Sequence, residues 1–375
     1  MRVLYIGPDV GTCRQRRQAL ERLGHDVFLA DPFAALPAPQ LSAPWAVHTG
    51  ALGLSAIVRR RVLARVGGRE FDVALVDSGC LVGPGLVRAL KQRARRVINY
   101  NPDNPFVARD GRRWRLFHQA LPEYDLYITP RWSSALAALG VGAARVLQTD
   151  FAADETAHRP RDLSAEARAR FAADVVFVGT WMPERGAFFA KLIQAGLPLR
   201  IFGPRWTRAP EYRVLQAHVT EGELDAEAYA HAICGAKIAI GLLSKGNEDL
   251  HTTRSLEIPA FGVLLCAERS DDHSAMYRDG EEAVFWNWDD AQECAEKCLE
   301  LLKHPERIAE IAAAGLRRVR ANRSFNEPLM AGFLAEAMRS GQERGGGELV
   351  AHPTLVNRSA FEAANIRSLR RRVQG

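Results

Sequence analysis

The amino-acid sequence predicts an α/β protein with two domains, each built around a parallel β-sheet. Short apolar segments alternate with helix-like segments along the chain, which is typical of strands joined by crossover helices. At 375 residues the chain is too long for one ordinary hydrophobic core. Its composition, 47% hydrophobic and 25% charged, is that of a folded globular protein.

The first predicted domain spans residues 1–160. The apolar segment RVLYIG is followed by a helix-like segment that stops at Gly24 and by a second strand, which together make one βαβ unit. Crossovers between parallel strands are right-handed, so the repeated alternation predicts one parallel sheet. The later strands are expected near residues 71–79, 95–105 and 124–130, with helices near 81–94 and 131–140, and the segment that begins ARVLQTD at residue 144 is expected to be a final strand before a polar linker.

The second predicted domain spans residues 161–340 and repeats the pattern. Strands are expected near residues 173–179, 197–203, 236–244 and 262–268, followed by a last strand and two helices up to about residue 319. Beyond it, residues 341–375 form a basic C-terminal tail that begins with the flexible segment ERGGGE and contains four arginines near its end. Two alternatives remain open for this tail: it is loosely ordered, or it packs back across the first domain.

Charge is distributed unevenly along the chain. Residues 1–160 contain 22 Lys and Arg against 14 Asp and Glu, a net charge of +8, while the whole chain carries +6. A basic first half suggests a partner that is acidic or membrane-associated, and a solvated Arg-rich surface is the alternative. None of the common nucleic-acid-binding signatures is present, so we expect no nucleic-acid partner.

The sequence also bears on location and thiol chemistry. No apolar stretch reaches the length of about 18 residues that spans a bilayer, so we expect a cytoplasmic protein, with peripheral contact at the inner membrane face as an option. The six cysteines are expected to be reduced and mostly buried. Cys294 and Cys298 share a helix face, but no nearby His or Cys completes a zinc site.

Polar residues at two strand ends of the second domain indicate a ligand site. Gly179 ends a strand just before a helix N-terminus, where backbone N–H groups favour an anion, and Arg185 can bind phosphate oxygens. Gly203, Arg205 and Trp206 follow the next strand, and the tryptophan is a candidate for flanking a nucleobase. Because ligands of parallel sheets bind beyond the carboxyl ends of the strands, we expect the functional cleft between the two domains.

A third polar segment precedes the apolar segment around residue 264. Thr252 or Thr253 is expected to cap a short helix that contains Arg254 and Glu257, and the carboxylate of Glu257 would accept hydrogen bonds from ribose hydroxyls. Asp249 lies before the cap and would bond sugar hydroxyls. The alternative is an acidic residue that offsets the helix dipole, together with a surface Arg–Glu pair.

The spacing of these residues resembles the motifs of retaining GT-B glycosyltransferases. Asp249 and Glu257 are separated by seven residues and followed by IPAFG, which resembles the acidic-x7-Glu signature and the small-residue turn after it. The segment VGTWMPERG resembles the phosphate-binding turn of the same group, with Arg185 at the position of its lysine. Thr180 stands where that motif has arginine, and Arg254 is the candidate replacement.

A wider resemblance, over roughly residues 1–330, is to the CgeB-like glycosyltransferases. It rests on segments that occur in one order along the chain: YIG with RRQALERLGHDV, then VFVGT, IFGPRW, RSLEIPAFGVLL and YRDGEEAVFW. This resemblance implies two Rossmann-like domains facing a central cleft, the GT-B fold, with a nucleotide-sugar donor on the second domain and an acceptor on the first. It also implies that no metal or other cofactor is needed. The acidic pairs Asp271–Asp272 and Asp289–Asp290 are therefore expected to be helix caps or solvated loop residues.

The implied activity is the transfer of a sugar from a nucleotide-sugar to a glycan, lipid-linked or protein acceptor. The resemblance implies retention of configuration, with Asp249 and Arg185 as catalytic residues. An inverting reaction would need a base from the first domain, for which Asp9, His48 and Asp103 are the candidates. Two other functions remain open: a non-catalytic nucleotide-sugar-binding or regulatory protein, and a GT-B nucleotide-sugar epimerase.

Overall fold

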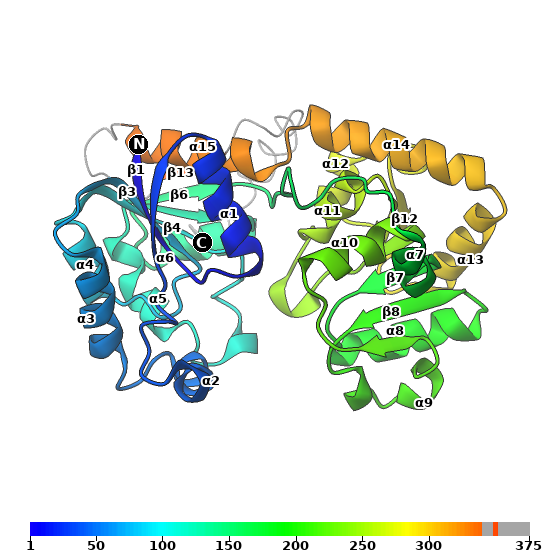
Figure 1. Cartoon of the computed structure of the whole chain (residues 1–375), viewed down its shortest axis with the longest axis horizontal. Coiled ribbons are helices and arrows are strands. Elements are labelled where there is room, and N and C mark those ends of the chain that lie inside the picture. The colour runs from blue at the N-terminus through cyan, green and yellow to red at the C-terminus, as the bar shows by residue number, and fades with distance from the viewer. Residues whose placement is uncertain (340–347, 352–375) are drawn as a thin grey trace, which may run out of the picture. The chain divides into compact units, whose positions relative to one another are not determined.

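The chain folds into two compact units (Figure 1). A computed structural model describes residues 1–339 and 348–351. Within this part of the chain, unit 1 consists of residues 1–155, 244–249, 324–339 and 348–351, and unit 2 consists of residues 156–243 and 250–323. Each unit contains one parallel sheet, which confirms the predicted α/β fold with two domains.

Unit 1 is organised around a seven-stranded sheet with the strand order β13-β6-β5-β4-β3-β1-β2. Its strands are β1 (Arg2–Ile6), β2 (Asp26–Ala30), β3 (Phe71–Asp77), β4 (Ala94–Tyr100), β5 (Leu126–Thr129), β6 (Arg145–Gln148) and β13 (Glu348–Ala351). Its helices are α1 (Gly11–Arg22), α2 (Pro39–Thr49), α3 (Ser55–Val66), α4 (Pro84–Leu90), α5 (Arg115–Ala120), α6 (Trp132–Gly140) and α15 (Asn326–Met338).

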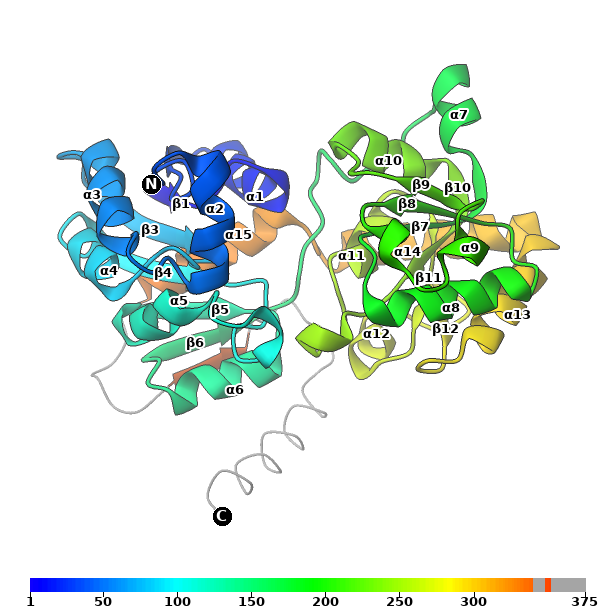
Figure 2. The same cartoon turned by 90° about the horizontal axis from the view of Figure 1, so that it is seen from below.

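Helices cover both faces of this sheet, which explains why its strands are apolar throughout. In β1, Val3 and Tyr5 contribute to a core cluster with α1 and α15, whereas Leu4 and Ile6 contribute to the cluster on the opposite face. Figure 2 shows α3 and α4 on the side of the sheet opposite to α15. Alternate strand residues therefore supply two separate cores.

Helix α15 joins unit 1 although the chain has passed through unit 2 before it. Its apolar side chains are buried against the sheet, and the rings of Phe333 and Tyr100 lie 5.0 Å apart. Arg22 of α1 adds ion pairs to Glu327 at 2.6 Å and to Asp154 at 3.0 Å. Residues 324–339 thus return to the first unit, so the predicted second-domain range 161–340 is too long at its end.

Strand β13 tests part of the prediction for the C-terminal tail. Residues Glu348–Ala351 pair in parallel with β6, so this part of the tail packs on unit 1. The basic end of the tail, which includes Arg367 and Arg370, lies outside the described residues. The chain first leaves unit 1 and enters unit 2 between residues 155 and 156, close to the predicted boundary at residue 160.

Unit 2 is organised around a six-stranded sheet with the strand order β12-β11-β10-β7-β8-β9. Its strands are β7 (Ala173–Val178), β8 (Leu199–Gly203), β9 (Val219–Glu221), β10 (Ala236–Gly241), β11 (Leu264–Glu268) and β12 (Val284–Trp286). Its helices are α7 (Ala165–Phe171), α8 (Pro183–Gln194), α9 (Tyr212–Leu215), α10 (Ala226–Cys234), α11 (Arg254–Ala260), α12 (Asp271–Met276), α13 (Ala291–Leu302) and α14 (Pro305–Ala321). Helix α8 packs on one face of the sheet and α10 and α11 on the other (Figure 1).

A buried ion pair connects α1 to the centre of the unit 1 sheet. Nε of Arg16 donates to Asp77 at 2.7 Å, and a second nitrogen of Arg16 donates at 3.0 Å. Tyr5 also donates its hydroxyl to Asp77, and Arg16 lies over the ring of Tyr100 at 5.1 Å. Burial, together with the Asp77 carboxylate, raises the pKa of Tyr5, so its hydroxyl stays protonated and remains a donor.

None of the helices in the described residues is long and apolar enough to cross a membrane.

Replacing Asp77 by alanine should destabilise unit 1 strongly. The change leaves the Arg16 guanidinium buried without its counterion, and losing one partner of a buried pair costs about 3–5 kcal/mol. The measurement is the free energy of unfolding of the full chain in urea. Arg14→Ala is the control, because Arg14 pairs with Asp9 while about half exposed, and its loss should cost about 0.5 kcal/mol or less. Equal losses in the two variants would contradict this account.

Candidate functional site

The ends of β7 and β8 in unit 2 form a tight double turn. The backbone N–H of Gly179 donates to the carbonyl of Phe202 at 2.9 Å, and that of Trp181 donates to the carbonyl of Pro204 at 3.0 Å. A Cβ built on Gly203 would lie 2.6 Å from the carbonyl carbon of Gly179, and Gly203 has a φ of +149°. Glycine is required here because two backbone segments approach each other too closely for a side chain.

Arg185 stabilises this turn from the first turn of α8. One of its terminal nitrogens donates to the carbonyl of Thr180 at 2.7 Å, and its guanidinium lies 5.3 Å from the centre of the Phe177 ring. Helix α8 begins with Pro183, and no side chain caps its N-terminus. The helix therefore presents backbone N–H groups and a positive dipole end beside Gly179 and Arg185, an arrangement that favours an anion.

Two buried polar atoms beside the turn have no hydrogen-bond partner among the described residues. They are Nε1 of Trp181 and Oε2 of Glu211. A Cβ built on Gly186 would lie 3.3 Å from this Trp181 nitrogen and 3.2 Å from the carboxyl carbon of Glu211, so both groups converge on the start of α8. Buried polar groups are nearly always satisfied, so this donor and this acceptor are available to a water molecule or a ligand.

The structure places Trp206 differently from the sequence-based expectation. Trp206 is fully buried in the core, packs against Phe189 and donates from Nε1 to the carbonyl of Gly179 at 3.0 Å. It therefore supports the turn and offers no ring face to a nucleobase. Arg205 is exposed in a left-handed conformation with a φ of +70°.

The third polar segment lies beyond β10, the neighbour of β7. Helix α11 begins at Arg254, but the side chain of its N-cap residue Thr253 makes no capping bond, so the predicted threonine cap is wrong. The hydroxyl of Ser255 instead accepts from the backbone N–H of Thr252 at 3.0 Å. The Arg254 side chain is 34% exposed and its buried Nε has no partner among the described residues, which leaves the guanidinium able to bind a further group.

Glu257 is buried and contacts protein groups from three parts of unit 2. Its carboxylate accepts from the hydroxyl of Tyr229 in α10 at 2.7 Å and from Arg254, while Nε2 of His158 lies 3.7 Å away. Only 2% of the residue is exposed. This placement does not favour the predicted contact with ribose hydroxyls, because the carboxylate is enclosed and its acceptor positions are used within the protein. It favours a role in positioning Arg254.

The environment of Glu257 keeps its carboxylate ionised. Burial by itself raises the pKa of a carboxyl group, but Arg254, His158 and the donated hydrogen bonds together hold the pKa of Glu257 below its ordinary value of 4.5. The residue is therefore a permanent negative charge at neutral pH.

Asp249 belongs to unit 1, not to the unit that contains Glu257. It is 4% exposed and accepts a hydrogen bond from Nε of Arg131 at 2.7 Å. Asn104 of unit 1 donates to the carbonyl of Asn247 at 3.2 Å, which holds the same segment, residues 244–249. This placement does not favour the predicted contact of Asp249 with sugar hydroxyls, because Arg131 binds its carboxylate, and the contact stays a prediction.

The candidate bases lie beyond strand ends of unit 1 or on α2. Asp9 follows β1, is 40% exposed at its side chain and pairs with Arg17 at 3.2 Å. Asp103 follows β4, is 30% exposed at its side chain and lies 3.6 Å from Arg113. His48 is exposed in the last turn of α2. All three side chains are accessible to a ligand.

The two acidic pairs have different roles. Asp290 caps α13 by accepting from the backbone N–H of Glu293 at 2.9 Å, as predicted for a cap. Asp272 instead contacts Nδ1 of His251 at 2.6 Å inside unit 2, so it is neither a cap nor a solvated loop residue. Sequence reasoning also missed His251 and Arg131. Only the position of Arg131 directly after a predicted strand could have drawn attention to it.

Three cysteines form the one group in the described residues that converges closely enough to hold a metal ion. The Sγ atoms of Cys266, Cys294 and Cys298 all lie within 4.8 Å of one another, and Cys266 comes from β11 rather than from α13. Structural zinc sites use four ligands, and these three thiols are enclosed in the apolar core of unit 2. None of the six cysteines, all of which lie in the described residues, forms a disulfide bond.

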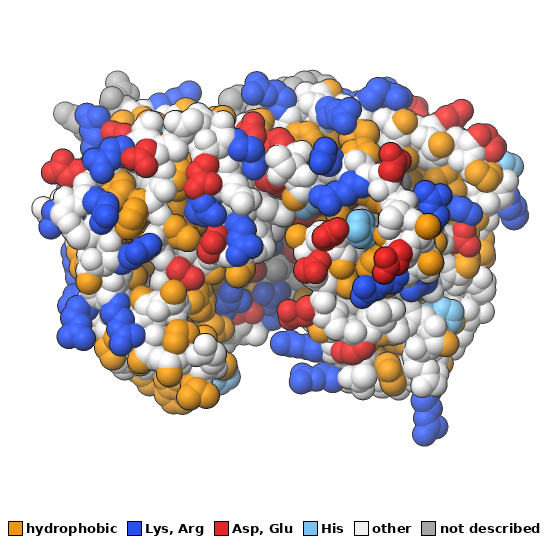
Figure 3. Space-filling view, in the orientation of Figure 1, with side chains coloured by type: hydrophobic (Ala, Val, Ile, Leu, Met, Phe, Trp, Pro, Cys, Tyr) orange, Lys and Arg blue, Asp and Glu red, His pale blue; other side chains and the backbone are white. Residues whose placement is uncertain are grey.

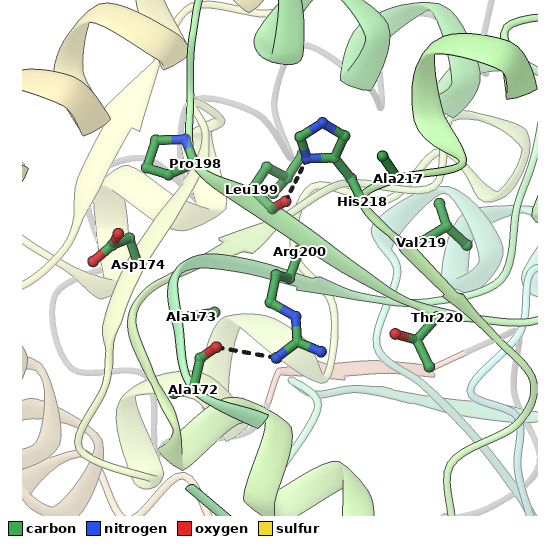
Figure 4. Close-up of a pocket in the computed structure, with 10 residues that line it drawn as sticks. All are labelled: Ala172, Ala173, Asp174, Pro198, Leu199, Arg200, Ala217, His218, Val219 and Thr220. Carbon is green, nitrogen blue, oxygen red and sulfur yellow. Dashed lines mark hydrogen bonds between the residues drawn. The ribbon is translucent and has the colours of Figure 1, made fainter. Parts of the chain in front are cut away.

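A shallow hollow of about 410 Å³ lies at the opposite edge of the unit 2 sheet (Figure 4). Its lining comes from the amino ends of β7, β8 and β9, and its polar groups tie those ends together. Arg200 donates to the carbonyl of Ala172 at 3.1 Å, and Nδ1 of His218 lies 2.9 Å from the carbonyl of Leu199. Because ligands of parallel sheets bind at the carboxyl edge, the double turn is the stronger candidate site.

Replacing Glu257 by alanine should reduce the stability of unit 2. The variant removes hydrogen bonds from Tyr229 and Arg254 to a charged acceptor, at a cost of about 2–3 kcal/mol. The pKa of Glu257 in the folded protein lies below its ordinary value of 4.5. The stabilisation by its carboxylate is therefore fully present above pH 4.5 and is lost as the pH falls through the lowered pKa. The measurement is the free energy of unfolding of wild type and variant at neutral and acidic pH.

Glu227→Ala is the control for this prediction, because the Glu227 side chain lies on α10 and is 75% exposed. Its removal should shift stability by about 0.5 kcal/mol or less. A Glu257→Ala variant as stable as this control at neutral pH would refute the structural role of Glu257.

Comparison with known proteins agrees with this geometry. Residues 185–329 match the family described as glycosyl transferase-like. No curated protein matches the chain in sequence. In structure, the chain is similar to the sucrose-phosphate synthase of Thermosynechococcus elongatus, with a TM-score of 0.65, 16% identity and coverage of 90% of this chain and 98% of that one.

Two further solved structures have the same fold. The UDP-forming α,α-trehalose-phosphate synthase of Burkholderia xenovorans, in complex with glucose-6-phosphate, has a TM-score of 0.62 and 12% identity, with coverage of 90% of this chain and 100% of that one. HepE of Anabaena, in complex with UDP and glucose, has a TM-score of 0.60 and 13% identity, with coverage of 91% and 100%. We conclude that the chain has the GT-B fold of glycosyltransferases and that its residues 185–329 carry a glycosyl transferase-like domain.

Proposed function

We propose that this protein is a glycosyltransferase that moves a sugar from a nucleotide-sugar, held on unit 2, to an acceptor held on unit 1. The observation that carries the proposal is the double turn at the ends of β7 and β8. There an uncapped helix N-terminus, Gly179 and Arg185 lie beside the unsatisfied polar atoms of Trp181 and Glu211. The match to a glycosyl transferase-like family and the UDP bound to HepE support a nucleotide-sugar as the donor.

The donor diphosphate fits the cationic groups of this edge. The N-terminus of α8 and the guanidinium of Arg185 would bind its oxygens. Arg254 would supply the contact that the family motif assigns to the residue at Thr180, because its Nε has no partner among the described residues. Gly203 and Thr253 would shape the site, and Arg205 would lie at its rim.

The chemistry follows from charge that develops during the reaction. Cleavage of the glycosidic bond places positive charge at the anomeric carbon and negative charge on the leaving diphosphate. Arg185, Arg254 and the α8 N-terminus would stabilise the diphosphate through preorganised electrostatics. In a retaining reaction, which we propose, the leaving phosphate takes the proton of the acceptor. An inverting reaction would use Asp9, His48 or Asp103 as the base.

The finer assignment rests on the order of the sequence motifs. We infer a CgeB-like enzyme that acts in the cytoplasm on a glycan, lipid-linked or protein acceptor. The donor should be identified first, by thermal shift with a panel of nucleotide-sugars, because its stabilising effect requires no knowledge of the acceptor.

Transfer should not require a divalent metal ion. Arg185, Arg254 and backbone N–H groups provide the positive charge that a cation would otherwise provide at the diphosphate. We therefore expect sugar transfer, or donor hydrolysis in the absence of acceptor, to persist in EDTA. Complete loss in EDTA with recovery on adding manganese would contradict this part of the proposal.

Arg185→Ala should lower turnover more than donor affinity. Its contact with the diphosphate strengthens as charge develops, and removing one such donor costs on the order of a hundredfold in rate. Arg185→Lys should recover part of the rate, because an ammonium group keeps the charge but not the planar geometry. Steady-state transfer and calorimetric donor affinity, measured for both variants, test this expectation.

Arg200→Ala is the matched control for Arg185. Arg200 also donates to backbone carbonyls, those of Arg170 and Ala172, but it lies at the amino edge of the same sheet. Turnover of this variant should equal that of wild type. If Arg185→Ala and Arg200→Ala behave alike, with equal melting temperatures, Arg185 is not a phosphate ligand.

The burial of Asp249 against Arg131 favours one alternative function, a binding protein without catalysis. Such a protein would bind the donor with the affinity of an enzyme but neither transfer nor hydrolyse it. An epimerase is distinguished by its product, because it converts the sugar of the nucleotide-sugar without any acceptor.

A further inference from the structure

Helix α2 of unit 1 exposes apolar side chains where a surface helix normally carries charge. Its sequence PQLSAPWAVHT contains no Lys, Arg, Asp or Glu, and Ala46 is its one buried residue. Leu41 is 81% exposed and Trp45 is 55% exposed, one helical turn apart. Leu52 follows in the next loop at 52% exposure, and its carbonyl accepts from Nε1 of Trp45 at 3.4 Å.

These three side chains form one surface, called here the α2 patch: Leu41, Trp45 and Leu52. Figure 3 shows hydrophobic side chains gathered at the lower end of unit 1, where Figure 1 places α2. A side chain that is 81% exposed protrudes from the surface and does not line a groove. The α2 patch therefore protrudes, as the side chains of a membrane-inserting element do.

Within residues 32–69, the segment that contains α2 and α3, every charged side chain is positive. Residues 32–69 contain five arginines and no Asp or Glu. Arg65 and Arg69 are held over the ring of Phe28, but Arg59 and Arg60 are exposed on α3 and make no ion pair within the described residues. Arg61 donates to the carbonyl of Ala35 at 3.3 Å, which holds α3 against the segment that leads into α2.

We propose that the α2 patch, with Arg59 and Arg60, docks unit 1 onto an anionic lipid bilayer. Exposed Leu and Trp beside unpaired arginines and without acidic residues are the composition of an interfacial membrane element. Trp favours the headgroup level because its ring is apolar and its N–H is polar. A negatively charged bilayer complements residues 32–69, which carry a net charge of +5.

The proposal does not depend on the proposed glycosyl transfer, since binding to vesicles is measured without a substrate. It does give a lipid-linked acceptor a physical basis, because α2 follows the carboxyl end of β2. That edge of the unit 1 sheet also carries the candidate bases Asp9 and Asp103.

The test is co-sedimentation of the full chain with vesicles of phosphatidylglycerol mixed with phosphatidylcholine, and with vesicles of phosphatidylcholine alone. We expect binding to the anionic vesicles that weakens as salt is added, and at least tenfold weaker binding to the neutral ones. The double variants Leu41→Glu/Trp45→Glu and Arg59→Glu/Arg60→Glu should each lose at least tenfold in affinity for anionic vesicles. Their melting temperatures should stay close to that of wild type, because all four side chains are exposed.

Val141→Glu/Arg95→Glu is the matched control, since it makes the same changes on exposed residues of unit 1. This variant should bind anionic vesicles as wild type does. Absence of binding by wild type at low salt overturns the proposal. Binding that survives in both α2-patch and arginine variants also overturns it, because the basic C-terminal tail would then carry the affinity.

Self-association tests whether a second copy of this chain, rather than a bilayer, covers the α2 patch. If the α2 patch were covered by a second copy of this chain, sedimentation without lipid would give a mass that rises with protein concentration, and Leu41→Glu/Trp45→Glu would abolish the rise. That result would show that the α2 patch binds a second copy of the protein rather than a bilayer, and it would overturn the proposal. A monomer at all concentrations supports it.

Discussion

The local structure of unit 2 depends on the buried carboxylate of Glu257. A permanent negative charge with 2% exposure is tolerated in a folded protein only when donors surround it. Here the donors are Tyr229 of α10 and Arg254 of α11, and His158 of the segment that enters unit 2 lies 3.7 Å away, so three separate segments meet at one carboxylate. The same contacts orient Arg254, whose Nε has no partner among the described residues.

A comparable buried charge organises unit 1. Asp77 ends β3 and receives donors from Arg16 in α1 and from Tyr5 in β1. In both units the charge lies near the carboxyl edge of a parallel sheet, where each strand delivers polar residues and glycines to one side. This edge tolerates charged groups because helix N-termini and backbone donors from successive βα turns are available to bind them.

Much of the fold could be predicted because its signals are local. The apolar segments of β1, β3, β7 and β11 each consist of a few consecutive residues, a glycine follows the first three, and each strand lies where the pattern indicates it. The turn at Gly179 and the position of Arg185 were predicted in the same way. Helices α2, α3 and α15 were not. Helix α2 has one buried residue and α15 packs on strands distant in sequence, whereas the regular spacing of Val58, Val62 and Val66 in α3 was overlooked.

The candidate site was predicted less completely, because the type of a polar residue does not show which group it binds in the folded protein. Asp249 and Glu257 lie eight positions apart in sequence, and spacing alone suggested one shared ligand. Their partners, Arg131 and Tyr229, are 118 and 28 residues away and could be identified only after folding. By itself, the sequence determined most of the strands, their order along the chain and the residues at their ends, since periodicity and turn chemistry act over short distances. The tertiary structure decided which carboxylates are buried, which unit residues 244–249 and 324–339 join, and that Cys266 meets Cys294 and Cys298, because these outcomes depend on contacts between residues far apart in the chain.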